Sequence, residues 1–182
     1  SEKHQLIQTL NITDLVVHQV ARLLKQFPLL NASLTESGIQ NHETIDIGVT
    51  TDVQERLYLV TLPDADTIPL HAMSLKRLGN VMELMRGNHH AVDLSGGTFA
   101  VTVLNEPATS HQIPIIYPGH AAILGLGGVQ TRFRPGDDGL PTLRQIVGLC
   151  ISYDHRFING ALASRFMQAV ADALASPVLD QE

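Results

Sequence analysis

The chain has 182 residues, of which 44% are hydrophobic, and its formal net charge at pH 7 is -6. This length and apolar content suit one domain with one substantial core. The negative charge argues against nonspecific nucleic-acid binding, and no apolar stretch is long enough for a membrane span or a signal peptide. We therefore expect an intracellular protein with no nucleic-acid and no membrane partner.

The first half of the chain alternates between helical and strand-like patterns. Thr13 is the expected N-cap of a helix with one apolar face, which Pro28 ends. Residues 45–49 alternate and residues 57–62 are rich in strand-forming residues, so two strands are expected there. A second helix is expected over residues 70–86. Its apolar residues, which we expect in the core, are Met73, Leu78, Val81, Met82 and Met85.

The second half predicts three strands and a closing helix. The strands are expected over residues 99–104, 121–127 and 143–151, the last being buried on most of its surface and carrying Cys150 as a small core residue. From Gly160 onward, apolar residues recur at helical spacing until Pro177 marks the end of the helix. Together, these elements predict the α+β class, as a two-layer sandwich with a mixed β-sheet covered by helices on one side.

A histidine stands at the joint between the last strand and the closing helix, in the run Ser-Tyr-Asp-His-Arg-Phe-Ile-Asn-Gly at residues 152–160. At such a joint, rigid elements fix the backbone while the side chain can face a cleft. His155 therefore suits the role of a catalytic base. Taken alone, however, a histidine near a strand end is more often a hydrogen-bonded structural residue.

Residues 152–161 resemble the signature of the catalytic domain of dihydrolipoamide acyltransferases, the core component of 2-oxo acid dehydrogenase complexes. Its H-x-x-x-D-G pattern also marks the related chloramphenicol acetyltransferases. Three further blocks resemble the family in the same order: Phe-Pro-Leu-Leu-Asn-Ala-Ser at 27–33, Leu-Ser-Gly-Gly-Thr-Phe at 94–99, and the segment at 114–125 that begins Pro-Ile-Ile and ends Ala-Ile-Leu-Gly. The resemblance runs from about residue 12 to residue 177.

The resemblance implies the transfer of an acyl group between dihydrolipoamide and coenzyme A. The favoured family member is the acetyltransferase of the pyruvate dehydrogenase complex. It makes His155 the general base and the Thr102 hydroxyl the donor that stabilises the tetrahedral oxyanion. Asn159 stands where most members carry aspartate. An amide cannot ionise, but it can orient neighbouring groups through hydrogen bonds. The resemblance assigns no residues that bind coenzyme A and no metal site.

The resemblance also implies a homotrimer with active sites between subunits, working with 2-oxo acid dehydrogenase and dihydrolipoamide dehydrogenase components in the cytoplasm or the mitochondrial matrix. Residues 1–182 are expected to be the catalytic domain without its opening segment, the lipoyl domain and the peripheral-subunit-binding domain. Residues 178–182 end the chain with two acidic side chains. Because burying unpaired carboxylates is costly, we expect assembly into a large core to be weakened or absent and the trimer to be the favoured state.

Two alternatives remain open: a noncatalytic acyltransferase-like scaffold trimer, and an O-acetyltransferase of the chloramphenicol type. The intact His155 and Thr102 favour activity over scaffolding, and residues 152–156 with the Gly-Gly-Thr-Phe block favour the lipoyl-linked branch. The glycines at 125–128 lack the third glycine of a dinucleotide fingerprint and are expected at a strand end. His89 and His90 lack the spacing of a metal motif and are expected in a solvated loop.

Overall fold

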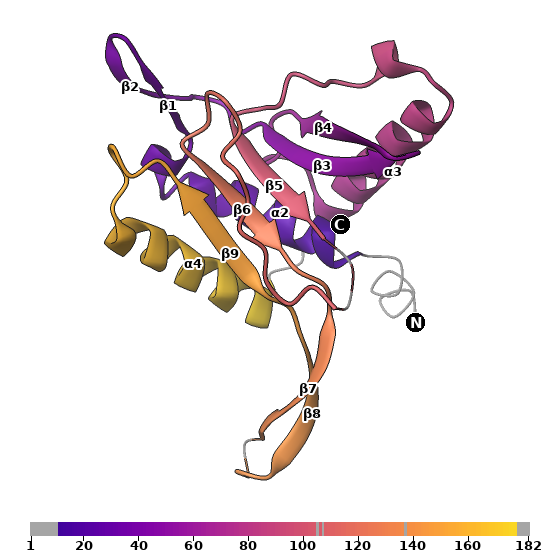
Figure 1. The fold of residues 1–182 in the computed structure, drawn as a ribbon, viewed down its shortest axis with the longest axis vertical. Helices are drawn as coiled ribbons and strands as arrows, with labels where there is room; N and C mark the ends of the chain where they lie inside the picture. Colours follow the sequence, from indigo (N-terminus) through magenta and orange to yellow (C-terminus); the bar gives the residue numbers. More distant parts are fainter. Residues whose placement is uncertain (1–10, 105, 107, 137, 178–182) are drawn as a thin grey trace.

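A five-stranded mixed sheet organises the protein, and helices cover one of its faces (Figure 1). The structure is a computed structural model that describes residues 11–104, 106, 108–136 and 138–177. The tail at 178–182, on which the expectation about large-core assembly rests, lies outside the described residues. The helices are α2 (Ile12–Leu24), α3 (Leu70–Met85) and α4 (Gly160–Ala175), with single 3₁₀ turns at Pro28–Leu30 and His89–Ala91. The predicted α+β sandwich is confirmed.

The central sheet has the strand order β4-β3-β5-β6-β9. The three inner strands, β3, β5 and β6, run parallel, and the outer strands β4 and β9 run antiparallel to their neighbours. Their bounds are β3 Ile47–Val53, β4 Arg56–Leu62, β5 Phe99–Val103, β6 Ala122–Leu126 and β9 Leu149–Tyr153. Two hairpins lie outside this sheet: β1 (Ala32–Thr35) with β2 (Gly38–Asn41), and β7 (Gln130–Pro135) with β8 (Pro141–Ile146).

Side chains of the inner strands point alternately to the two faces of the sheet, one covered by the helices and the other left open. On β3 and β5, Val49 and Val101 are buried in the main apolar cluster together with residues from all three helices. Phe166 of α4 packs edge-on against Phe99, with ring centroids 6.0 Å apart. Successive strand side chains point to opposite sides, so Thr102 lies on the face that the helices leave uncovered. None of the described helices is long and apolar enough to cross a membrane.

The N-cap of the first helix lies two residues earlier than predicted. Asn11 is the N-cap of α2, and its side-chain oxygen accepts a hydrogen bond of 3.1 Å from the backbone N–H of Thr13. Thr13 is itself buried within the first turn, so the prediction of Thr13 as the cap is wrong. Both residue types can cap helices, and the choice depends on which side chain reaches the free N–H groups. The helix ends at Leu24, and Pro28 opens a 3₁₀ turn.

The predicted core stripe of α3 is largely wrong. Met73 is buried and Val81 is half-buried against a second apolar cluster, but Leu78, Met82 and Met85 are exposed by 54%, 44% and 60%. The helix turns a polar side toward α2, where the Arg77 guanidinium pairs with the fully buried Asp14 carboxylate. A buried carboxylate needs such a partner, and this requirement overrides the apolar pattern in orienting the helix.

The predicted strand over residues 143–151 is two strands in different sheets. It breaks at residues 147–148, where a side chain on Gly148 would collide with the carbonyl oxygen of Ser110. The first part, β8, pairs with β7 in a hairpin that projects from the rest of the protein, leaving Leu143 58% exposed (Figure 1). The second part, β9, keeps its place at the sheet edge. Its Cys150 is half-buried, and the thiol donates a hydrogen bond to the Gln112 carbonyl.

The Gly-Gly pair before β5 has a steric requirement for glycine. Gly96 and Gly97 have φ values of +95° and +71°, a region that L side chains rarely adopt. A side chain at Gly97 would also collide with the carbonyl oxygen of Asp46. That same carbonyl accepts the N–H of Thr98 at 2.7 Å. The two glycines therefore let β5 begin directly beside β3, which sets the register that positions the site.

Candidate active site

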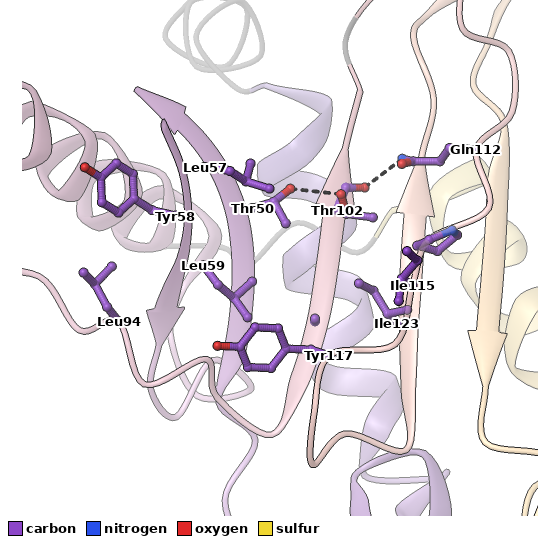
Figure 2. Close-up of a pocket in the computed structure, with 12 residues that line it drawn as sticks. Thr50, Leu57, Tyr58, Leu59, Leu94, Thr102, Gln112, Ile115, Tyr117 and Ile123 are labelled. Carbon is purple, nitrogen blue, oxygen red and sulfur yellow. Dashed lines mark hydrogen bonds between the residues drawn. The ribbon is translucent and has the colours of Figure 1, made fainter. Parts of the chain in front are cut away.

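A cavity of about 470 Å³ lies on the open face of the sheet (Figure 2). This volume is within the range of small-molecule sites. No charged side chain is among the described residues that line it. The lining consists of Thr50, Leu57, Tyr58, Leu59, Leu94, Ala100, Thr102, Gln112, Pro114, Ile115, Tyr117 and Ile123.

Thr102 lies in this cavity, near the carboxyl end of β5. The Thr50 hydroxyl on β3 donates a hydrogen bond of 3.1 Å to the Thr102 hydroxyl oxygen. The Gln112 side-chain amide donates to the backbone carbonyls of Thr102, at 3.1 Å, and Leu126, at 2.8 Å. Among the residues described, none accepts the hydrogen of the Thr102 hydroxyl. That hydrogen is therefore free to be donated to a ligand in the cavity.

The sequence reasoning missed Thr50 and Gln112. The alternation of Ile45, Ile47 and Val49 already indicates that residue 50 points to the opposite side of its strand. Nothing in the sequence indicates that β5 lies next to β3 with Thr102 beside Thr50. Gln112 comes from an extended segment outside the strands, and the residues around it show no alternation or motif that would place it near Thr102.

His155 lies in the tight turn between β9 and α4, as the sequence predicts. The turn is fixed through Asp154, whose N–H donates to the Ala121 carbonyl at 2.8 Å and whose carbonyl accepts the N–H of Ile158 at 3.0 Å. The imidazole itself is exposed. It lies beside the ring of Tyr153, with centroids 5.5 Å apart. It has no hydrogen-bond partner within the described part of the chain.

The residues that flank His155 form an ion pair across the turn. The Asp154 carboxylate accepts the backbone N–H of Arg156 at 3.0 Å and is paired with its guanidinium. These hydrogen bonds hold the pKa of the Asp154 carboxyl below its ordinary value and raise the pKa of the Arg156 guanidinium. Both groups therefore stay charged near neutral pH, and each is neutralised by the other.

Asn159 is the N-cap of α4. Its side-chain oxygen accepts a hydrogen bond of 2.9 Å from the Leu162 N–H, and the side chain is exposed. This position fixes the end of the turn that holds His155, four residues earlier. An aspartate could accept the same bond, so the departure from the family pattern leaves this geometry intact.

A single chain does not bring His155 and Thr102 together. Thr102 pairs with Gly125 on β6, whereas Tyr153, the last residue of β9, pairs with Ala122. At about 3.3 Å per residue and about 4.8 Å between strands, the backbones of Thr102 and Tyr153 are about 14 Å apart. The chain then turns toward α4 on the opposite face, and His155 does not line the cavity. The two predicted residues therefore lie at opposite ends of the sheet.

The histidines in the described part of the chain form no metal centre. His89 is half-buried in a 3₁₀ turn and stacks on Tyr58, with ring centroids 5.5 Å apart, so the expected loop is a short, packed turn. No group of three or more histidine, cysteine, aspartate or glutamate side chains in these residues could hold a metal ion.

Sequence comparisons place the chain among acyltransferases. The profile of the family "2-oxoacid dehydrogenases acyltransferase (catalytic domain)" matches residues 1–179. The chain is 32% identical over 169 residues to the dihydrolipoyllysine-residue succinyltransferase component of the 2-oxoglutarate dehydrogenase complex of Cupriavidus necator, covering 92% of this chain and 40% of that protein. It is 29% identical to the lipoamide acyltransferase component of the branched-chain alpha-keto acid dehydrogenase complex of Bacillus subtilis, covering 88% of this chain and 38% of that protein. The chain thus spans less than half the length of these relatives.

Solved structures agree. A probable dihydrolipoamide acetyltransferase from Listeria monocytogenes superposes with a TM-score of 0.87 at 27% identity, covering 95% of this chain and 74% of that one. A dihydrolipoamide acetyltransferase from Azotobacter vinelandii, studied for the catalytic roles of a serine, a histidine and an asparagine four positions after the histidine, gives 0.81 at 26%, with coverages of 92% and 69%. A chloramphenicol acetyltransferase, at 15% identity and a TM-score of 0.58, shares the fold. The chain belongs to the family of 2-oxoacid dehydrogenase acyltransferase catalytic domains.

Proposed function

We propose that this protein transfers an acetyl group between dihydrolipoamide and coenzyme A as the core acyltransferase of a pyruvate dehydrogenase complex. The observation that carries the proposal is the free hydrogen of the Thr102 hydroxyl in the apolar cavity, in a chain of this family that also presents an exposed histidine in a fixed turn.

The chemistry needs a base and an oxyanion donor. His155 takes the proton of the attacking thiol, and the resulting thiolate sulfur attacks the carbonyl carbon of the thioester. Negative charge develops on the carbonyl oxygen, which the Thr102 hydroxyl stabilises by donating its hydrogen bond. When the tetrahedral intermediate collapses, the carbon–sulfur bond to the other thiol breaks, and the leaving thiolate takes the proton back from His155. Coenzyme A and dihydrolipoamide exchange the acyl group without any other reactant.

The site requires two copies of the chain. A base and an oxyanion donor must both lie within a few ångströms of one carbonyl group, whereas the backbones at Thr102 and Tyr153 are about 14 Å apart in one subunit. We propose that His155 of one subunit faces Thr102 of its neighbour in a homotrimer. The histidine and asparagine studied in the Azotobacter vinelandii enzyme have the same four-residue spacing as His155 and Asn159, which supports their assignment to the site.

The cavity favours an uncharged acyl group. A succinyl group carries a second carboxylate, and burying that charge without a cationic partner is costly. No described residue of the lining is charged. This feature supports acetyl over succinyl, although the succinyltransferase of Cupriavidus necator is among the relatives. It leaves the branched-chain acyl groups as the second candidate.

The relatives support a proposal about the partner enzymes and the location of this protein in the cell. The curated relatives are components of 2-oxo acid dehydrogenase complexes, and one related structure is the cubic core of a pyruvate dehydrogenase complex. We propose that this chain works with 2-oxo acid dehydrogenase and dihydrolipoamide dehydrogenase components, in the cytoplasm or in the mitochondrial matrix of a eukaryotic source.

The test is the rate of acyl transfer to free dihydrolipoamide from acetyl-, isobutyryl- and succinyl-coenzyme A. We expect the acetyl donor to react fastest and the succinyl donor slowest. The His155→Ala variant should lose activity by about a hundred- to ten-thousandfold, the usual contribution of a general base. His90→Ala removes another exposed imidazole and should leave the rate unchanged. Folded trimers without turnover, or a His155→Ala variant with the wild-type rate, would overturn the proposal.

A further inference from the structure

We infer that Thr50 is a positioning residue, which directs the hydrogen of the Thr102 hydroxyl toward the oxyanion. The inference rests on the proposed function, because it concerns the donor of that same site. Thr50 and Thr102 lie on adjacent strands and point into the same cavity, as Figure 2 shows.

The Thr50 hydroxyl has two bonds whose directions are fixed. Its oxygen accepts the backbone N–H of Val103 at 3.1 Å, and its hydrogen is donated to the Thr102 hydroxyl oxygen at 3.1 Å. A backbone N–H can only donate, so the Thr50 oxygen is the acceptor of the first bond. The geometry of the second bond makes the Thr50 hydroxyl its donor, so the one hydrogen of that hydroxyl is used on Thr102.

Thr102 consequently receives a hydrogen bond and keeps its own hydrogen for a ligand. Two consecutive hydrogen bonds lead from the Val103 N–H to the Thr50 hydroxyl and from there to the Thr102 hydroxyl, which lines the cavity. Consecutive hydrogen bonds of this kind polarise one another, so the last hydroxyl becomes a stronger donor. A donor that already points to where charge develops needs no reorganisation during the reaction.

A purely structural role for Thr50 would need only the first of these bonds. The main-chain pairing of β3 with β5 ends at Val49 and Val101, and the Thr50 side chain takes the next N–H, that of Val103. This hydrogen bond holds the ends of the two strands together. The second hydrogen bond, to the Thr102 hydroxyl, is not needed for that purpose and connects Thr50 to the proposed oxyanion donor.

Kinetics of Thr50→Val, which keeps the side-chain shape but lacks the hydroxyl, test this link. The loss of one hydrogen bond predicts a fall in kcat of about threefold to tenfold, with little change in KM for coenzyme A. Thr50→Ser should restore kcat. Thr51→Val is the matched control, because Thr51 is the next residue of β3 and its hydroxyl donates to its own strand at the Val49 carbonyl. If Thr50→Val does not fold, the smaller Thr50→Ala serves in its place.

The decisive comparison repeats the substitution in a Thr102→Val background. If Thr50 acts through Thr102, adding Thr50→Val should lower kcat no further. An equal loss in both backgrounds, or a Thr50→Val enzyme with the wild-type kcat, would overturn the inference while Thr102→Val still impaired the enzyme. If Thr102→Val itself kept the wild-type kcat, the proposed donor would be wrong and the inference would fail with it.

Discussion

The two ends of the central sheet hold their proposed catalytic groups in different ways. At the carboxyl end of β5, the Thr102 hydroxyl is hydrogen-bonded to Thr50 and its carbonyl to Gln112, so both the backbone and the side chain have partners. At the other end, the backbone around His155 is held by hydrogen bonds to neighbouring segments. The imidazole is exposed there and has no hydrogen bond from the described residues.

This difference indicates which half of the site is complete in one chain. A catalytic base is normally oriented by a third group that accepts or donates at its second nitrogen. The described residues provide no such group for His155, whereas the direction of the Thr102 hydroxyl is already set. We therefore expect the neighbouring subunit to supply both the orienting contact and the second half of the site.

Mixing two inactive variants gives the largest expected effect. His155→Ala and Thr102→Ala should each be nearly inactive as homotrimers, but a hybrid trimer contains interfaces where one subunit supplies His155 and its neighbour supplies Thr102. With random mixing, about one quarter of the sites should be intact. The measurement is acetyl transfer after the two variants are unfolded together and refolded as a mixture.

The control is to refold the same two variants separately and combine them afterwards, which should yield no gain. If the co-refolded sample is also inactive although mass spectrometry detects hybrid trimers, His155 and Thr102 do not meet across an interface. The contrast between the two ends of the sheet would then need another explanation.

Local patterns in the sequence predicted the His155 end better than the Thr102 end. An apolar strand, a tight turn and an amphipathic helix follow one another there, and β9 and α4 confirm this order. The arrangement around Thr102 depends on the pairing of β3 with β5, which are about 50 residues apart in the chain. Alternation predicts the face of Thr50 but not its neighbour, because register is a property of the folded sheet.

Two of the wrong predictions, the single strand over residues 143–151 and the core stripe of α3, have the same physical origin. Apolar composition continues through residues 143–151, but a close approach of backbones at Gly148 divides the segment between two sheets. In α3, the buried carboxylate of Asp14 decides which side of the helix faces inward, and the apolar Met82 and Met85 point outward. In both cases a tertiary contact overrides a pattern that is correct locally.

Substituting the helix caps tests whether the His155 turn must be rigid. Asn159→Ala removes the cap of α4, and Asn11→Ala removes the corresponding cap of α2. Each should lower the free energy of unfolding in urea by about 1 kcal/mol. Only Asn159→Ala should also lower acetyl transfer, because only its cap fixes the turn that carries His155. Asn159→Asp should retain both stability and activity, and an equal loss of activity in both alanine variants would contradict this role of the turn.

The smallest expected effect is a pH dependence of stability that arises from His120, at the His155 end of the sheet. Burial lowers the pKa of the His120 imidazole below its ordinary 6.5, aided by the charge of His42 and opposed by the hydrogen bond with the Gly97 carbonyl. Its Nδ1 is buried without a partner among the described residues, so protonation there would bury an unpaired N–H. The unfolded chain therefore binds this proton at a higher pH than the folded protein does, and stability should fall as pH drops below about 6.5.

Urea unfolding at pH 7.5 and 5.5 should show a smaller pH-dependent loss for His120→Gln than for the wild type, whereas His90→Gln should behave as the wild type. An unchanged loss in His120→Gln would separate His120 from the acid sensitivity. The bonds between Val103, Thr50 and Thr102 contain no group that titrates in this range, so the acid-sensitive group lies at the end of the sheet that holds His155.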